Sequence, residues 1–443
     1  MDSNAPPPPR DRHRPNFRAQ HRARSHESAH ADAVASADDS GVRPDLPLIC
    51  RGEAQVVTTD DHLRQLLAEL RADGSFAYDT EFIGELTYYP QLCVVQVASH
   101  QRIGLIDPLA GIDLRPLWEL LADPSVEKIV HAGEQDIEPV VRHLNRPAAN
   151  VFDTQIAAGL IGLPYPVSLS KLVVELTGAK LGKGLTFSHW DQRPLSSIQL
   201  RYAADDVRYL PAARAEMGRR LDKLGHAAWA GEECTAMCDT SLYRFDPETS
   251  YLRVRGAASL PPRNQAVLRE LTNWRDAAAR KHDVPPRSFL KDEVLADLAK
   301  NPVKSADKLS RVRGLPRPVE HEYGNEIVEA TSRAMSMPAP NLPSAREPEP
   351  TATEKFRSDA LFAAAQCICA GLSLDPSLVA SRQDVGEFYR HVTGDGAGEP
   401  PLLLRGWRRE AVGEMLTEFL AGKRKVGLEW VDEALHAMVG GRP

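Results

Sequence analysis

The sequence feature that most constrains the fold is an acidic pair inside an apolar segment, Phe76-Ala77-Tyr78-Asp79-Thr80-Glu81-Phe82. The apolar residues predict a buried β-strand, and side chains two positions apart on a strand lie on the same face. Asp79 and Glu81 therefore project together, repel each other and lose hydration. A divalent cation compensates such a pair, because hard oxygen ligands suit Mg²⁺ and Mn²⁺. The alternative is a strand end with one solvated acid and one helix-capping acid, so only further carboxylates make a metal site the better interpretation.

The composition places few limits on the function. A chain of 443 residues with 42% apolar content is long enough for two or three domains. A net charge of -7 argues against a uniformly basic nucleic-acid binder. The six cysteines lack the spacing of a metal site or of a secreted disulfide scaffold. Because the chain also has no apolar run of membrane-spanning length and no leader, we expect a soluble, cytoplasmic protein without a membrane partner.

The order of the predicted elements indicates the fold class. Residues 1–45 contain a run of four prolines followed by Arg, His, Ala and Ser, which predicts a disordered tail. From residue 46, three strand-like segments follow one helix, and strands then alternate with helices. Hairpin strands followed by crossovers predict a mixed sheet covered by helices, hence an α/β domain over residues 46–235.

Two further acids follow predicted strands. In Gly133-Glu134-Gln135-Asp136-Ile137 the chain leaves a strand and enters a helix, and active sites in open α/β sheets gather at such exits. Asp136 alone would be an ordinary acid in the first turn of a helix. Asp153 is a comparable case, and we interpret it as a cap at a helix start.

Another candidate pair lies on the predicted helix over residues 195–210. Tyr202 and Asp206 are four positions apart, so the phenol and the carboxylate share one helix face. Asp205 is a competing carboxylate, about 100° around the helix from Asp206. The alternative interpretation is a tyrosine that packs its ring beside a solvated Asp206.

Taken together, these segments resemble the ribonuclease D group of the DEDD superfamily of 3′-5′ exonucleases, in its tyrosine-bearing branch. The resemblance spans residues 50–225 and implies a ribonuclease-H-like fold. It is carried by seven segments in this order: Tyr78-Asp79-Thr80-Glu81-Phe82, Gln91-Leu92-Cys93-Val94-Val95-Gln96, His131-Ala132-Gly133-Glu134-Gln135-Asp136, Phe152-Asp153-Thr154-Gln155, Ser168-Leu169-Ser170-Lys171-Leu172, Trp190 with Arg193-Pro194-Leu195, and Tyr202-Ala203-Ala204-Asp205-Asp206-Val207.

The resemblance implies roles for the acids and for the tyrosine. It makes Asp79, Glu81, Asp136 and Asp206 the ligands of two divalent cations, Mg²⁺ or Mn²⁺, and makes Tyr202 the residue that orients the attacking water. Two such ions activate the water and stabilise the leaving 3′-oxygen of a phosphodiester. The sequence departs from the family at position 205, where relatives commonly have a small residue. This departure leaves the last ligand open, although the interval from Tyr202 favours Asp206.

Four further residues are assigned to contacts with nucleic acid. Lys183, Trp190 and Arg193 lie between the second and third acidic sites and suit a backbone contact beside a stacking surface. The alternative for this segment is a surface loop with a packed tryptophan. We also assign Gln96, in the second matched segment, to nucleic-acid contact.

The carboxy-terminal half is predicted to be helical. Residues 258–337 resemble the helicase and ribonuclease D carboxy-terminal (HRDC) module, and residues 251–337 contain 16 Lys and Arg against 11 Asp and Glu. This local excess favours RNA binding, although a solvated helical bundle explains the same charges. Residues 338–354 predict a proline-rich linker, and residues 355–437 predict a second HRDC-like helical domain by position.

The resemblance implies a metal-dependent exoribonuclease that trims RNA with a single-stranded 3′ end, in tRNA or structured-RNA processing. One alternative is a DNA exonuclease, because no residue in the sequence can be assigned to recognition of the ribose 2′-hydroxyl. Another is an inactive nucleic-acid-binding scaffold. The presence of all four acids and of the tyrosine weakens that last interpretation.

Overall fold

The computed structural model describes residues 46–182, 189–338, 350–394, 396, 398–431 and 434–441. The expected amino-terminal tail and most of the expected linker lie outside these residues. The chain divides into two compact units, which are described separately. The first contains residues 46–81, 92–244 and 350–441, and the second contains Phe82–Gln91 and residues 245–338. Within the described chain, no helix combines the length and the apolar character that crossing a membrane requires.

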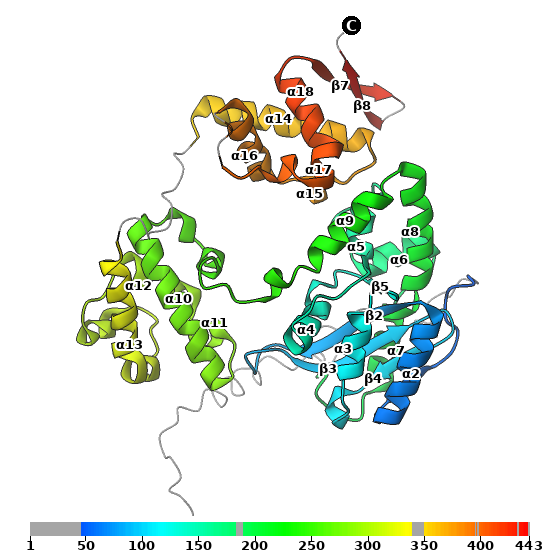
Figure 1. Cartoon of the computed structure of the whole chain (residues 1–443), viewed down its shortest axis with the longest axis horizontal. Helices are drawn as coiled ribbons and strands as arrows, with labels where there is room; N and C mark the ends of the chain where they lie inside the picture. The colour runs from blue at the N-terminus through cyan, green and yellow to red at the C-terminus, as the bar shows by residue number, and fades with distance from the viewer. Residues whose placement is uncertain are drawn as a thin grey trace, which may run out of the picture. The chain divides into compact units, whose positions relative to one another are not determined.

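The first unit is built on a six-stranded mixed sheet with the strand order β1-β4-β3-β2-β5-β6 (Figure 1). β3 and β4 are antiparallel, whereas β1 with β4, β2 with β5 and β5 with β6 are parallel. The parallel pairs confirm the expected crossovers, and the fold is the expected ribonuclease-H-like mixed sheet. The strands are β1 (Ala54–Val57), β2 (Ser75–Ile83), β3 (Gln91–Ala98), β4 (Ile103–Ile106), β5 (Glu127–Val130) and β6 (Val151–Asp153).

Helices pack on both faces of this sheet, and alternate residues of β2 belong to different cores. Phe76 and Tyr78 pack in one core with residues of α2 and α3. Ala77 packs in the other core with Ala204 of α7. Asp79 and Glu81 share the face of Ala77 because of the two-residue period. The helices are α2 (Asp60–Asp73), α3 (Arg115–Leu121), α4 (Glu134–Leu144), α5 (Thr154–Gly159), α6 (Leu169–Thr177), α7 (Ser197–Arg208), α8 (Leu210–Leu224) and α9 (Ala227–Met237).

Local sequence signals fix the start of α7. Ser196 and Gln199 form a capping box, in which each side chain bonds the backbone N–H of the other residue. Ala203 and Ala204 are fully or almost fully buried. Their small side chains let α7 approach the sheet closely, which brings the polar residues of the same helix next to the acids of β2.

The carboxy-terminal part of this unit is helical only up to residue 420. It comprises α14 (Ala352–Gly371), α15 (Pro376–Val379), α16 (Arg382–Thr393), α17 (Gly406–Arg408), a π-helix (Arg409–Gly413) and α18 (Glu414–Leu420). The antiparallel strands β7 (Arg424–Val431) and β8 (Ala434–Gly441) follow. The prediction of an all-helical domain to residue 437 is therefore wrong at its end. The alternation of Val426, Leu428 and Trp430 with Lys425, Gly427 and Glu429 was the overlooked strand signal.

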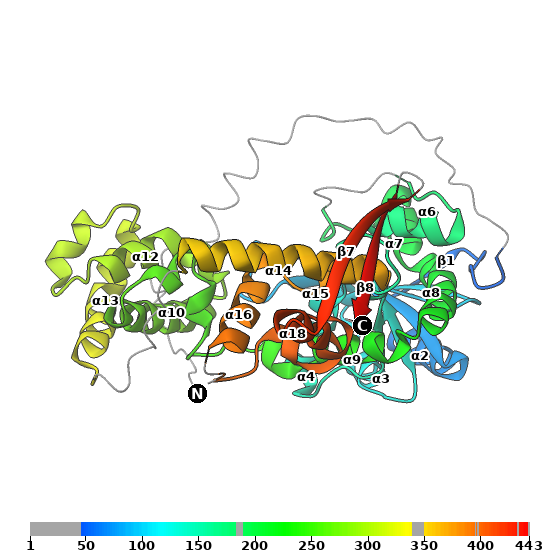
Figure 2. The same ribbon diagram turned by 90° about the horizontal axis from the view of Figure 1, so that it is seen from above.

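This carboxy-terminal module belongs to the same compact unit as the sheet. Arg408 donates two hydrogen bonds to the Glu233 carboxylate of α9, at 2.6 and 2.8 Å. The Trp407 indole donates to the same carboxylate at 2.7 Å and stacks on Trp229, with ring centroids 5.8 Å apart. In this module α15 contacts α5 and α17 contacts α9, and the module lies beside α9 in both views (Figures 1 and 2). Its buried side chains continue the core of the sheet domain, so it is an integral part of that domain's packing.

All the regular elements within residues 245–338 of the second unit are helical, as predicted. Trp274, Phe289 and Tyr323 form an edge-to-face aromatic cluster in its core. The segment Phe82–Gln91 also belongs to this unit: the Tyr88 hydroxyl donates to Asp276 at 2.5 Å. The elements are 3-10 turns at Ser250–Arg253, Ala257–Ser259 and Ala306–Arg311, together with α10 (Pro262–His282), α11 (Pro286–Phe289), α12 (Asp292–Lys300) and α13 (Arg317–Ser336).

Removing Trp407 tests whether the carboxy-terminal module stabilises the sheet domain. Trp407 is 1% exposed, so Trp407→Ala should lower the free energy of unfolding by about 3–5 kcal/mol. The matched control is Phe356→Ala, because Phe356 is an aromatic residue that is 74% exposed. Circular dichroism in a urea titration measures both variants. Similar small losses in the two variants would show that the module contributes little.

Candidate active site

Three elements of the first unit bring four acids together. Asp79 and Glu81 project from β2 on the face of Ala77, Asp136 lies in the first turn of α4, and Asp206 lies on α7. Burial raises the pKa of Asp79 well above its ordinary value. The negative charges of Asp136, Asp206 and Glu81 raise it further. The structure thus places Asp136, Asp206 and Glu81 close enough to Asp79 for their charges to act on it.

Asp136 is buried, whereas Asp79, Glu81 and Asp206 are partly buried. Burial, followed by the charge of Asp136, raises the pKa of Glu81 to about 7. Burial also raises the pKa of Asp136 to about 6. The hydrogen bond from Thr80 lowers this pKa, and the charge of Asp153 raises it. Burial and the charges of Glu81 and Asp205 raise the pKa of Asp206 to about 8. No Lys or Arg among the described residues forms an ion pair with any of the four acids.

The donor set fits divalent cations. Buried carboxylates are stable when they are paired or coordinate a metal, and oxygen donors of this kind are those that Mg²⁺ and Mn²⁺ prefer. Within the described chain, no three His, Cys, Asp or Glu side chains already form a close ligand cluster. Ligation of an ion by these four acids would therefore require their carboxylates to move closer together.

Tyr202 lies against the acid cluster. Asp206 lies one helical turn away on α7, as the four-residue interval predicts, and its charge acts on the phenol. Burial and the charges of Asp206, Glu81 and Asp79 raise the pKa of the phenol far above its ordinary value. Tyr202 therefore remains protonated and acts as a hydrogen-bond donor rather than as a base.

Asp205 has a different environment from Asp206. It accepts a hydrogen bond from Arg208 Nε at 2.9 Å, and Arg208 is 4% exposed. The same guanidinium donates to the carbonyl oxygens of Cys50 and Gly52, at 2.5 and 3.1 Å. Asp205 thus helps to join α7 to the segment before β1, which favours Asp206 as the member of the cluster.

The sequence interpretation missed two residues that hold Asp136. The Tyr78 hydroxyl donates to the Asp136 carbonyl oxygen at 2.9 Å. The Thr80 hydroxyl donates to the Asp136 carboxylate. Both residues alternate with Asp79 and Glu81 along β2, and this alternation was the available signal. One strand therefore supplies two acids and also fixes a third.

Two of the four residues assigned to nucleic-acid contact, Trp190 and Gln96, are buried. Trp190 is 4% exposed, and its ring centroid lies 6.1 Å from that of Tyr202. This environment favours the alternative interpretation, a packed tryptophan. Gln96 is fully buried, and neither polar atom of its amide has a hydrogen-bond partner among the described residues. Lys183 lies outside the described residues.

The Arg193 guanidinium binds other groups of the protein. Its guanidinium makes two hydrogen bonds of 2.6 Å to the carboxylate of Asp107, which follows β4. It also donates to the carbonyl oxygens of Cys93 and Trp190, at 2.7 and 2.8 Å. Such complete use of the donors ties the segment before α7 to β3 and leaves little capacity for a phosphate contact.

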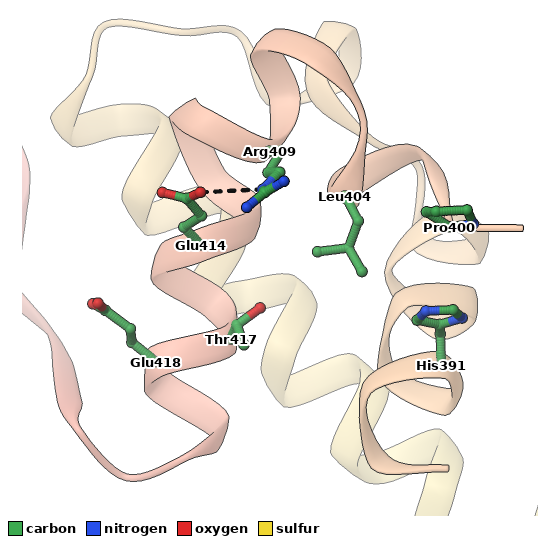
Figure 3. A pocket seen from close by; sticks show the side chains of 7 residues that line it. All are labelled: His391, Pro400, Leu404, Arg409, Glu414, Thr417 and Glu418. Carbon is green, nitrogen blue, oxygen red and sulfur yellow. Dashed lines mark hydrogen bonds and ion pairs between the residues drawn. The ribbon is translucent and has the colours of Figure 1, made fainter. Parts of the chain in front are cut away.

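A separate cavity of about 500 Å³ lies in the carboxy-terminal module. Figure 3 shows that two of the lining side chains, Arg409 and Glu414, point toward each other. Arg409 Nε lies 3.1 Å from Glu414 Oε1 in their ion pair. None of the four acids lines this cavity. Its lining consists of His391, Pro400, Leu404, Arg409, Glu414, Thr417 and Glu418.

Comparisons with known proteins agree with this architecture. A 3′-5′ exonuclease family model matches residues 54–222, and an HRDC domain model matches residues 264–331. The chain is 36% identical over 381 residues to a ribonuclease D of Gluconacetobacter diazotrophicus, across 84% of this chain and 94% of that protein. It is 35% identical to a ribonuclease D of Pseudomonas paraeruginosa, across 83% and 98%.

A solved structure extends the similarity to the whole fold. The crystal structure of Escherichia coli RNase D, described as an exoribonuclease involved in structured RNA processing, matches with a TM-score of 0.74 and 30% identity. The match covers 84% of this chain and 99% of that chain. Fold and sequence together define a 3′-5′ exonuclease domain accompanied by an HRDC domain. The chain belongs to the ribonuclease D family, and it is a 3′-5′ exoribonuclease.

Replacing single acids tests the proposed ligand set. Asp79→Asn or Asp206→Asn should lower the rate of 3′-end trimming roughly a hundredfold or more, because each removes a charged oxygen donor. Thermal stability should not fall, because each change removes a buried repelling charge. Asp205→Asn is the matched control and should retain cleavage. Full activity in Asp79→Asn would contradict the assignment, and so would equal loss in Asp205→Asn and Asp206→Asn.

Removing the phenol hydroxyl tests the role of Tyr202. Tyr202→Phe should slow turnover about tenfold, because one positioned hydrogen bond is lost. The Mg²⁺ concentration for half-maximal rate should stay within about twofold of the parent value, because no charged ligand is removed. Single-turnover cleavage across a Mg²⁺ titration measures both quantities. A variant as fast as the parent would exclude the positioning role.

Proposed function

We propose that Asp79, Glu81, Asp136 and Asp206 hold two divalent cations, Mg²⁺ or Mn²⁺, at which the 3′-terminal phosphodiester of RNA is hydrolysed. The observation that carries this proposal is the proximity of four carboxylates, one buried and three partly buried, from three separate segments, without a compensating basic side chain in the described chain. Four negative charges balance two divalent ions. A cluster of this composition is costly for a protein that binds no cation.

The protein side chains have distinct parts in this proposal. Bound cations would lower the pKa of the attacking water and stabilise the leaving oxygen. The carboxylates of β2, α4 and α7 provide the ligands, and Thr80 orients Asp136. Tyr202 donates a hydrogen bond from a phenol that stays protonated, so it positions the water and does not deprotonate it.

We propose that the single-stranded 3′ end of the RNA is the part that reaches the four acids. We also propose that the substrate is tRNA or another structured RNA, and that the reaction takes place in the cytoplasm. The names of the relatives and the description of the E. coli enzyme support an RNA substrate. The second unit offers a basic surface for the phosphate backbone. Between residues 304 and 317, Asp307 is the single acid, and the exposed basic residues are Lys304, Lys308, Arg311, Arg313 and Arg317.

Cleavage of labelled substrates tests the function. We expect 5′-labelled RNA to give a ladder of products shortened from the 3′ end with Mg²⁺ or Mn²⁺, and EDTA to remove it because the carboxylates alone do not activate water. A matched DNA oligonucleotide and an RNA with a base-paired 3′ end are the controls. Preferential degradation of DNA would favour a DNA exonuclease, and binding without products would favour an inactive scaffold.

A further inference from the structure

We propose that Asp153 is a positioning residue for the reaction, because its carboxylate clamps the turn that carries Asp136 into the acid cluster. The inference rests on the proposed role of Asp136 as a cation ligand. Asp153 ends β6, whereas the turn connects β5 to α4. β5 and β6 are adjacent parallel strands, so their carboxyl ends lie side by side.

The Asp153 carboxylate accepts backbone hydrogen bonds from two segments. Oδ1 accepts from the N–H groups of Gln155 and Ile156 at 2.7 and 3.3 Å, which is the expected cap of α5. Oδ1 also accepts from Ala132 N–H at 3.2 Å, and Oδ2 accepts from Gly133 N–H at 2.9 Å. The side chain is 1% exposed, so these donors replace its hydration. A cap alone would use a single oxygen.

The turn at residues 132 and 133 needs external support. Ala132 has a φ of 57°, a left-handed conformation that is unfavourable for a residue with a side chain. A Cβ at Gly133 would lie 2.5 Å from Val130 Cβ, so the backbone passes close to the preceding strand. Such backbone conformations persist where surrounding groups hold them in place. Two hydrogen bonds to one buried carboxylate supply that restraint.

The restraint reaches Asp136 through a single helical turn. The Gly133 carbonyl oxygen accepts from the N–H groups of Asp136 and Ile137, at 3.1 and 3.2 Å. A displacement of Gly133 therefore moves the start of α4 and the Asp136 side chain with it. β5 lies between β2 and β6 in the sheet. Tyr78 and Thr80 hold Asp136 from β2, and Asp153 restrains the turn before Asp136 from β6.

Asp153→Asn separates the clamp from simpler roles. Asn is as good a helix cap as Asp, so a role limited to capping α5 predicts almost no effect. Removing the negative charge beside Asp136 would, through charge alone, weaken the attraction for a cation and leave the backbone of the turn unchanged. The clamp predicts in addition that this backbone loosens, because an amide has only one accepting oxygen. If that oxygen keeps the α5 cap, the amide nitrogen faces the Gly133 N–H and can accept no hydrogen bond from it.

Another aspartate that caps a helix, and that is less buried than Asp153, provides the matched control. Asp375 caps α15 by accepting from Ser377 N–H at 2.8 Å, and it holds no second turn with its other oxygen among the described residues. Asp375→Asn should therefore leave kcat, KM and the cation requirement unchanged. The two variants introduce the same chemical change into the same compact unit.

The test combines kinetics with hydrogen exchange of the full chain. For Asp153→Asn we expect kcat to fall about tenfold, since a buried donor is left unsatisfied, with the KM for RNA within about twofold of the parent. The Mg²⁺ concentration for half-maximal rate should rise. Without cation or RNA, mass spectrometry should show faster exchange in peptides that contain residues 131–136. Peptides that contain the α5 cap should exchange as in the parent.

Several results would overturn the clamp. Unchanged exchange in residues 131–136 would do so even if the variant lost activity through partial unfolding. An unchanged kcat and Mg²⁺ requirement in a folded Asp153→Asn variant would also do so. The proposed function is judged separately by Asp136→Asn: if that variant is inactive while Asp153→Asn behaves like the parent, the cation site stands and the clamp is wrong.

Discussion

The structure of the catalytic domain is organised around the repulsion between four carboxylates, one buried and three partly buried. In addition to burial, the charges of Asp136, Asp206 and Glu81 raise the pKa of Asp79, that of Asp136 raises the pKa of Glu81, and that of Glu81 raises the pKa of Asp206. Folding must therefore hold like charges close together, which requires restraint from the surrounding backbone. The hydrogen bonds from Tyr78 and Thr80, the capping box of α7 and the turn held by Asp153 provide this restraint.

The same requirement explains the packing around the cluster. Small residues on α7 allow that helix to lie close to the sheet, and the contacts of Arg193 and Arg208 attach its two ends to neighbouring segments. The carboxy-terminal module adds to this support, because Trp407 and Arg408 bind α9 and extend the core. A domain that must tolerate internal repulsion gains from such additional buried surface.

The two accessory parts of the chain therefore differ in character. The HRDC domain lies in its own compact unit, has its own aromatic core and carries the exposed basic stretch of residues 304–317. The carboxy-terminal module was expected to be a separate helical domain. It instead shares a core with the exonuclease domain and ends in the β7–β8 hairpin. Similar helical patterns in sequence thus led to different tertiary roles.

The sequence by itself determined the mixed α/β domain and the helical HRDC domain, and it predicted the four acids and Tyr202 as the candidate site. These follow from strand and helix periodicity, the Asp79–Glu81 and Tyr202–Asp206 intervals, and the family resemblance. Tertiary structure alone decided that Trp190 and Gln96 are buried, that Arg193 binds Asp107, and that Asp153 reaches the turn before Asp136. The physical reason is that periodicity reports which face a side chain occupies within its own element, whereas a partner far along the chain depends on how separate elements pack.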